Sequence, residues 1–231
     1  MIVDIIENFK KVNNNIANAI EKGNKGNKVS LIAVTKNHTI EEISNIVNQN
    51  HFLLGENRVQ ELLEKYDSLP EEVQWHLIGH LQKNKVKYIT DKVKLIHSLD
   101  SYGLAKEINK RMKPLEKPMD CLVQVNIAEE ESKFGLKIAE TIPFIEEVSH
   151  LPFVRIKGLM TMAPYVENPE EVRPVFKEAY NIFQQVKEKN IPNVNMDTLS
   201  MGMTNDYQIA IEEGATIVRV GSAIFGPRSY N

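Results

Sequence analysis

Apolar and polar residues alternate along this chain in blocks, and the blocks predict regular elements. Eight short apolar runs are separated by stretches in which apolar residues recur every three or four positions. The short runs are typical of buried strands, and the longer stretches are typical of amphipathic helices. The predicted strands cover residues 29–35, 52–55, 74–79, 94–99, 119–126, 154–162, 196–200 and 216–221.

Helix start signals fall between these runs. Thr39 and Glu42 have the spacing of a capping box, and Asn168 precedes a proline at the first helical position. Before the first strand, residues 2–20 carry an apolar stripe at helical spacing, which predicts an additional N-terminal helix. Further helix starts are predicted at Asn57, Ser101 and Thr204.

The regular alternation of strands and helices predicts a parallel sheet. Several strands are apolar on both faces, as a sheet covered by helices requires. We count eight strands and find no break that divides them. The pattern therefore favours a single α/β domain over residues 1–231, built as a (β/α)8 TIM barrel with an extra N-terminal helix, rather than an open doubly wound sheet.

Composition narrows the class of function. The chain has 231 residues and a formal net charge of -3, so no basic field favours nucleic-acid binding. No stretch approaches the roughly 18 apolar residues of a membrane span, and Asp4 and Glu7 lie where a signal peptide would be basic. A single cysteine, Cys121, is typical of a reducing compartment. We expect a cytoplasmic protein that binds neither nucleic acid nor membrane.

A charged residue, Lys36, follows the first predicted strand. Because side chains alternate along a strand, Lys36 points into the barrel if Ile32 and Val34 do. The functional groups of such barrels lie at the C-terminal ends of the strands. Among low-dielectric walls the pKa of a lysine amine falls, and the amine becomes a nucleophile that can form a Schiff base. Taken alone, Lys36 is as well explained by a solvated strand end.

The last predicted strand adds independent signals. By the same alternation Arg219 and Gly221 face the interior, and an inward arginine needs an acceptor that its own strand and flanks do not supply. Gly221 and Ser222 provide backbone N–H groups and a hydroxyl where barrels of this type bind phosphate. Ser200, at the end of the seventh strand, could face the same phosphate.

These groups together fit pyridoxal 5'-phosphate (PLP). The aldehyde would bond to Lys36, the phosphate would contact Ser200, Gly221 and Ser222, and the pyridine nitrogen would accept a hydrogen bond from Arg219. Because the pKa of arginine is ordinarily above about 12, the pyridine nitrogen would stay unprotonated and act as a poor electron sink. Carbanion chemistry is then disfavoured, whereas formation and exchange of the imine are not.

Longer segments identify a family. The chain contains LIAVTK, LGENRVQELLEKY, WHLIGHLQKNK, HSLDS, ESKFGL, KGLMTM, LSMGMTND and GATIVRVGSAIFG. In these segments and their order it resembles the pyridoxal 5'-phosphate homeostasis protein family, the single-barrel relatives of the alanine racemase N-terminal domain. The resemblance implies a cytoplasmic PLP-binding barrel. We do not include His80 among the implied contacts, because the family pattern varies at that position. The cofactor contacts that it implies are Lys36, Asn57, His76, Ser200, Arg219, Gly221 and Ser222.

Three functions compete at this point. A non-catalytic carrier, which holds PLP as a lysine Schiff base and hands it to PLP-dependent apo-enzymes, is favoured. A PLP-dependent amino-acid racemase with weak activity is the alternative. An aldolase that uses Lys36 directly on a sugar phosphate would leave Arg219 without a purpose.

The racemase alternative requires a second base. Racemases that resemble this barrel add a β-rich domain whose partner subunit supplies a catalytic tyrosine, and we expect no such domain after the eighth strand. Tyr165, Tyr207 or Tyr230 could replace that tyrosine, although no pattern marks any of them. Without the second domain we expect a monomer. No metal site is predicted, because the four-residue spacing of His76 and His80 does not gather ligands on a strand.

Overall fold

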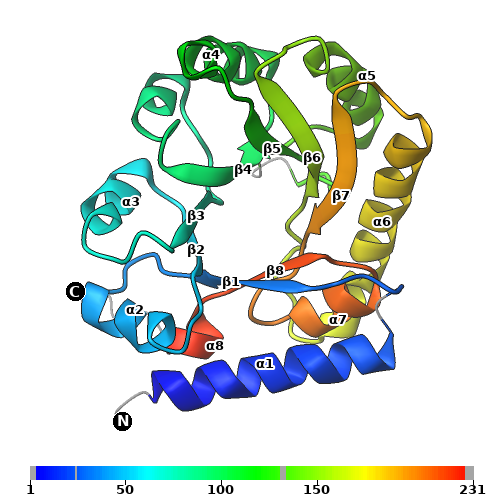
Figure 1. Cartoon of the computed structure of the whole chain (residues 1–231). Coiled ribbons are helices and arrows are strands. Elements are labelled where there is room, and N and C mark those ends of the chain that lie inside the picture. The colour runs from blue at the N-terminus through cyan, green and yellow to red at the C-terminus, as the bar shows by residue number, and fades with distance from the viewer. Residues whose placement is uncertain (1–3, 24, 131–133, 227–231) are drawn as a thin grey trace.

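A closed parallel barrel forms the centre of the protein. The computed structural model describes residues 4–23, 25–130 and 134–226. Within them, eight strands follow one another around the barrel in sequence order, and β1 pairs with both β2 and β8 (Figure 1). The strands are β1 Ser30–Val34, β2 Leu53–Glu56, β3 Gln74–Leu77, β4 Val93–Leu99, β5 Met119–Gln124, β6 Val154–Met160, β7 Val194–Ser200 and β8 Ile217–Val220.

Helices surround this barrel and connect its strands (Figure 1). The predicted (β/α)8 barrel is confirmed, and the end of each predicted strand lies within two residues of the observed one. The α-helices are α1 Ile5–Lys22, α2 Ile40–Val47, α3 Val59–Tyr66, α4 Tyr102–Met112, α5 Ile138–Val148, α6 Arg173–Glu188, α7 Tyr207–Glu212 and α8 Ser222–Phe225. The 3₁₀ helices are η1 Lys83–Tyr88, η2 Lys113–Leu115 and η3 Pro169–Val172.

The predicted helix starts have mixed outcomes. The Thr39–Glu42 capping box is present, and Asn168 accepts from the Glu170 N–H, although it caps the 3₁₀ turn that leads into α6. Ser101 precedes α4 as expected. The helix predicted after Asn57 is present as α3, but Asn57 does not cap it, because Arg58 is the residue before its first turn.

The prediction at Thr204 is wrong, because α7 begins three residues later. There the Asp206 carboxylate accepts from the Met203 N–H at 2.6 Å and so folds residues 203–206 into a turn. The Asp206 and Tyr207 N–H groups also close this turn, because both donate to the Met203 carbonyl, at 3.1 and 2.9 Å. The turn places polar residues at the end of the barrel that carries the functional site.

The extra N-terminal helix is confirmed as α1. It runs along the outside of the barrel beside α7 and α8 (Figure 1). The Asn8 amide donates to the Ile224 carbonyl at 3.1 Å, and the Asn15 amide donates to the Tyr207 hydroxyl at 3.0 Å. These bonds connect α1 to α8, which follows the last strand, and to α7, which follows the turn after β7.

The interior separates into two apolar layers. A large outer layer packs the helices on the sheet, and a smaller cluster fills the barrel. The inner cluster comprises Ile32, Val34, Ile78, Leu95, Leu122, Met160 and Ile217. Since Ile32 and Val34 belong to it, the inward alternation predicted for β1 is confirmed.

Two absences apply to the described residues. No helix among them is long and apolar enough to cross a membrane. In the same residues, no three His, Cys, Asp or Glu side chains gather in a way that could hold a metal ion.

Candidate functional site

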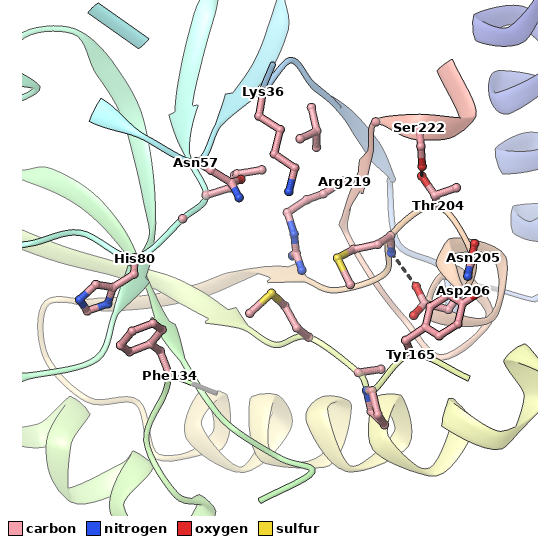
Figure 2. A pocket seen from close by; sticks show the side chains of 18 of the residues that line it. Lys36, Asn57, His80, Phe134, Tyr165, Thr204, Asn205, Asp206, Arg219 and Ser222 are labelled. Carbon is pink, nitrogen blue, oxygen red and sulfur yellow. Dashed lines mark hydrogen bonds between the residues drawn. The ribbon is translucent and has the colours of Figure 1, made fainter. Parts of the chain in front are cut away.

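A cavity of about 750 Å³ opens at the C-terminal ends of the strands (Figure 2). Its walls come from segments far apart in the sequence, which closure of the barrel brings together. Five of the seven predicted site residues line it, and the other two do not. The five are Lys36, Asn57, Arg219, Gly221 and Ser222.

Lys36 and Arg219 face the same cavity. Lys36 follows β1 and Arg219 lies on β8, and the two strands are neighbours with Ile32 opposite Arg219. Figure 2 shows the Lys36 amine and the Arg219 guanidinium pointing into the shared space. An amine that can attack a carbonyl and a fixed cation that can orient an acceptor therefore stand on one wall.

Arg219 is almost fully buried, with 4% of its surface exposed, and hydrogen bonds hold its guanidinium in place. Its Nη1 donates to Ser200 Oγ at 2.5 Å, and its Nη2 donates to the Thr161 carbonyl at 2.9 Å. Burial lowers the pKa of Arg219 to about 10, with the Asp206 carboxylate opposing that shift. The guanidinium is nevertheless charged at neutral pH, as expected from the sequence. The two bonds use two of its five N–H groups, which leaves donors for a ligand.

Ser200 and His76 lie beneath the cavity instead of lining it. His76 Nδ1 lies 2.9 Å from His97 Nε2, and His97 Nδ1 lies 3.0 Å from Ser200 Oγ, so a buried polar row leads to Arg219. Ser200 pairs with Ile217, two residues before Arg219, which sets it one layer deeper in the barrel. Both were predicted to contact the cofactor, but their depth makes them part of the row that supports the arginine from below.

The buried histidines should make folding stability fall in acid. Burial lowers the pKa of His76 from 6.5 to about 4, and burial also lowers the pKa of His97. Below about pH 6.5 the His76 side chain binds a proton in the unfolded chain but not in the folded protein. The contribution of His76 to the free energy of unfolding is therefore complete above that pH and is lost as the pH falls toward 4. We expect His76 alone to remove about 2–3 kcal/mol of unfolding free energy between about pH 7.5 and pH 4.5.

Urea unfolding at several pH values measures this effect. His76→Gln keeps a polar side chain but cannot titrate, so its stability should vary less with pH than that of the wild type. Equal pH dependence in the two proteins would show that His76 is not responsible.

The turns after β7 and β8 form a polar wall. Ser222 Oγ donates to Thr204 Oγ1 at 3.2 Å, and the Ala223 N–H donates to the same oxygen at 3.4 Å (Figure 2). From the sequence, Ser200 was expected on this side. The structure instead places residues 203–206 on the cavity, because the turn closed by Asp206 carries the chain over the barrel end. Hydroxyl and N–H groups here suit a phosphate.

Asn57 and the opposite wall come from the turns after β2 and β3. Gly79 also lines the cavity and is required by close packing, since a Cβ there would lie 2.3 Å from the Asn57 carbonyl oxygen. His80, omitted from the prediction, does line the cavity. Its ring stacks on Phe134 with a centroid distance of 3.9 Å, and its Nδ1 lies 3.4 Å from Asp100 Oδ2. The parity of Ile78 and His80 was the signal that could have identified it.

The three tyrosines considered for a second base have different positions. Tyr165 lines the cavity and is 82% exposed, whereas Tyr207 is buried and bonded to α1. Tyr230 lies outside the described residues. Further cavity residues that the sequence did not single out are His38, Gln124, Glu130, Met162, Met203 and Asn205.

The residues present fit PLP. Lys36 can bond to an aldehyde, Arg219 can donate to a ring nitrogen, and the hydroxyl wall at Ser222 and Thr204 can take a phosphate. Arg219 already spends two N–H groups on protein acceptors that fix its plane, so the ligand meets a preorganised donor.

Known proteins match this chain over nearly its whole length. The family model described as alanine racemase, N-terminal domain, matches residues 8–229. A relative from Aquifex aeolicus, named pyridoxal phosphate homeostasis protein, is 43% identical over 226 residues, which are 97% of this chain and 98% of that protein.

Solved structures agree with the fold. PipY from Synechococcus elongatus, solved with PLP bound, is 30% identical, with a TM-score of 0.83 and coverage of 96% of this chain and 100% of PipY. An alanine racemase from Clostridium difficile is 16% identical, with a TM-score of 0.74 over 97% of this chain and 58% of the racemase, and shows the fold alone. The chain belongs to the alanine racemase N-terminal domain family and, within it, to the pyridoxal phosphate homeostasis proteins.

Proposed function

We propose that this protein binds PLP through an imine bond to Lys36 and takes part in intracellular PLP homeostasis, without robust catalysis of its own. The observation that carries the proposal is that the Lys36 amine and the Arg219 guanidinium face one cavity beside a hydroxyl-rich wall. The relative that is 43% identical is named a homeostasis protein, and the PipY structure contains PLP, which supports the same reading.

Each wall of the cavity has a role in this proposal. Lys36 supplies the nucleophilic nitrogen, and Ser222 and Thr204 with the adjacent backbone hold the phosphate. Arg219 orients the ring through its nitrogen, while His76 and Ser200 support the arginine from below. Asn57 contacts the cofactor from the turn after β2.

When bound, PLP supplies an aldehyde for imine exchange and a ring that can withdraw electrons. Arg219 carries a positive charge at neutral pH and does not give its proton to the ring nitrogen. The residues therefore favour holding and exchanging the cofactor over removal of a substrate proton.

We further propose that residues 1–231 act as one cytoplasmic PLP-binding domain in a monomer and deliver PLP to apo-enzymes. A solvent-exposed residue such as Tyr165 at the cavity is consistent with cofactor exchange.

Weak racemase activity is the second candidate, because Tyr165 does line the cavity. Its 82% exposure argues against efficient proton transfer, which benefits from a site closed to water.

Absorbance titration of the purified protein with PLP tests the proposal. We expect a visible imine band, and borohydride reduction should leave the cofactor mass on the peptide containing Lys36. Alanine and other amino acids should not racemise above background, with an alanine racemase as positive control. Absence of the reduced adduct would refute PLP binding through Lys36, and saturable racemisation would favour the enzyme.

A further inference from the structure

A buried ion cluster lies behind the barrel wall that carries Lys36. Lys65 on α3 places its Nζ 2.7 Å from Glu56 Oε1 and 2.8 Å from Glu61 Oε1. The Lys65 side chain is 8% exposed, and that of Glu56 is fully buried. None of the three residues lines the cavity at the end of the barrel.

The cluster forms hydrogen bonds to the residues on both sides of Lys36. Lys65 Nζ donates to the Thr35 carbonyl at 2.7 Å, and the Thr35 hydroxyl donates to Glu56 Oε1 at 2.6 Å. On the other side, the Asn37 N–H donates to Glu61 Oε1. Thr35 is thus bonded to Lys65 and Glu56, and Asn37 is bonded to Glu61, so one cluster holds the residues on both sides of Lys36.

One of the residues held by these hydrogen bonds has an unusual backbone conformation. Asn37 has a φ of 62°, in the left-handed region that non-glycine residues seldom adopt. The conformation costs free energy and persists only where surrounding contacts impose it. The bond from the Asn37 N–H to Glu61 is such a contact, and it lies one residue from the amine that faces the cavity.

Stability alone is a poor explanation for the cluster. A buried ion pair is often no more stabilising than apolar residues of similar volume, because both charges lose their hydration. Within the described residues, Glu56 Oε2 has no hydrogen-bond partner, and burial raises the pKa of Glu56. An unsatisfied buried oxygen adds to the free-energy cost of the cluster.

Lys65 itself is unsuited to bond PLP. Its three acceptors, the Thr35 carbonyl, Glu56 and Glu61, take all three N–H groups of an ammonium. Nucleophilic attack needs a free lone pair on nitrogen, which this arrangement withholds. The two lysines therefore have separate tasks.

We propose that Lys65, together with Glu56 and Glu61, positions Lys36 for imine formation by fixing the backbone at Thr35 and Asn37. The inference rests on the proposed function, because it concerns the amine that meets the aldehyde. These residues are positioning residues and do not touch the ligand.

Two ligands separate positioning from general structural support. PLP carries the aldehyde, whereas pyridoxine 5'-phosphate has the same ring and phosphate without it. In Lys65→Met we expect the rate of imine formation with PLP to fall on the order of 10- to 100-fold, because a small misplacement of a reacting group has effects of that size. The affinity for pyridoxine 5'-phosphate should change less than about twofold, since the other walls are intact.

Matched variants control the comparison. Lys157→Met removes a lysine that pairs with Asp197 at 2.6 Å outside the cavity, and it should behave as wild type. Glu61→Ala removes the acceptor of the Asn37 N–H at a carboxylate that is 16% exposed, so it gives a second test if Lys65→Met does not fold. Glu61→Gln keeps an oxygen acceptor and should recover most of the rate lost in Glu61→Ala.

The outcomes discriminate clearly. Unchanged imine formation in both Lys65→Met and Glu61→Ala would overturn the inference, and so would an equal loss of affinity for both ligands. Failure of the wild-type protein to form an imine would instead overturn the proposed function, which the same titration reveals first.

Discussion

Lys36→Ala is expected to abolish the visible imine band while leaving a folded protein that still binds PLP weakly. The variant removes the nitrogen that bonds the aldehyde, but it leaves Arg219 and the hydroxyl wall at Ser222 in place. Apparent affinity should fall at least tenfold, equivalent to about 1.4 kcal/mol. Absorbance titration, borohydride reduction and mass analysis measure the loss, and circular dichroism checks the fold.

Lys94→Ala is the matched control, because Lys94 is exposed on β4 and does not line the cavity. It should retain both the band and the reduced adduct. A Lys36→Ala protein as yellow as wild type would place the covalent bond elsewhere and remove the basis of the proposed function.

Arg219→Glu is expected to change the chemistry that the bound cofactor permits. A carboxylate near the ring nitrogen favours a protonated pyridine, which withdraws electrons far better than a neutral one. Addition of amino acids should then produce long-wavelength carbanion absorbance that the wild type lacks. Rapid-scan spectra with alanine before and after the substitution measure this change.

Arg219→Gln separates charge from lost contacts. Both substitutions remove the bonds to Ser200 and the Thr161 carbonyl, which should cost each variant about 1–3 kcal/mol of stability because a buried acceptor is left unpaired. Only the glutamate offers a negative charge. Identical spectra with amino acids for the two variants would contradict the link between Arg219 and an unprotonated ring nitrogen.

Strand positions and inward directions could be predicted because both are local properties. Apolar runs that end in turn residues mark the strands, and the two-residue period then fixes which side chains face inward. From Ile32 and Val34 this period led to Lys36, and on β8 it led to Arg219; both line the cavity.

Depth along the barrel axis could not be predicted in the same way. His76 shares the inward parity of His80 but lies two inward steps below it, at about 6.6–7 Å a step. The register between β3 and β4 also shifts at Trp75/His76. The pairing of neighbouring strands therefore decides which inward residue reaches the cavity. Here it places His76 and Ser200 in the buried row under Arg219.

Contacts between segments distant in sequence were likewise hidden. Lys65 lies thirty residues from Thr35, yet it donates to the Thr35 carbonyl. Asp206 closes a turn that replaced the predicted helix start at Thr204. In the sequence, Glu56, Glu61 and Lys65 were part of the family segment LGENRVQELLEKY, and only the packing of α3 beside β2 brought them together as an ion cluster.

The barrel, its extra helix, and an inward lysine paired with an inward arginine could all be predicted from the amino-acid order, because residue periodicity and strand order depend on neighbours in the chain. The three-dimensional packing was needed to show which polar residues line the cavity, which lie beneath it, and what holds Lys36 in place. Those features depend on strand register and helix packing, because a small shift of a strand decides whether a side chain lines the cavity or forms a buried hydrogen bond beneath it.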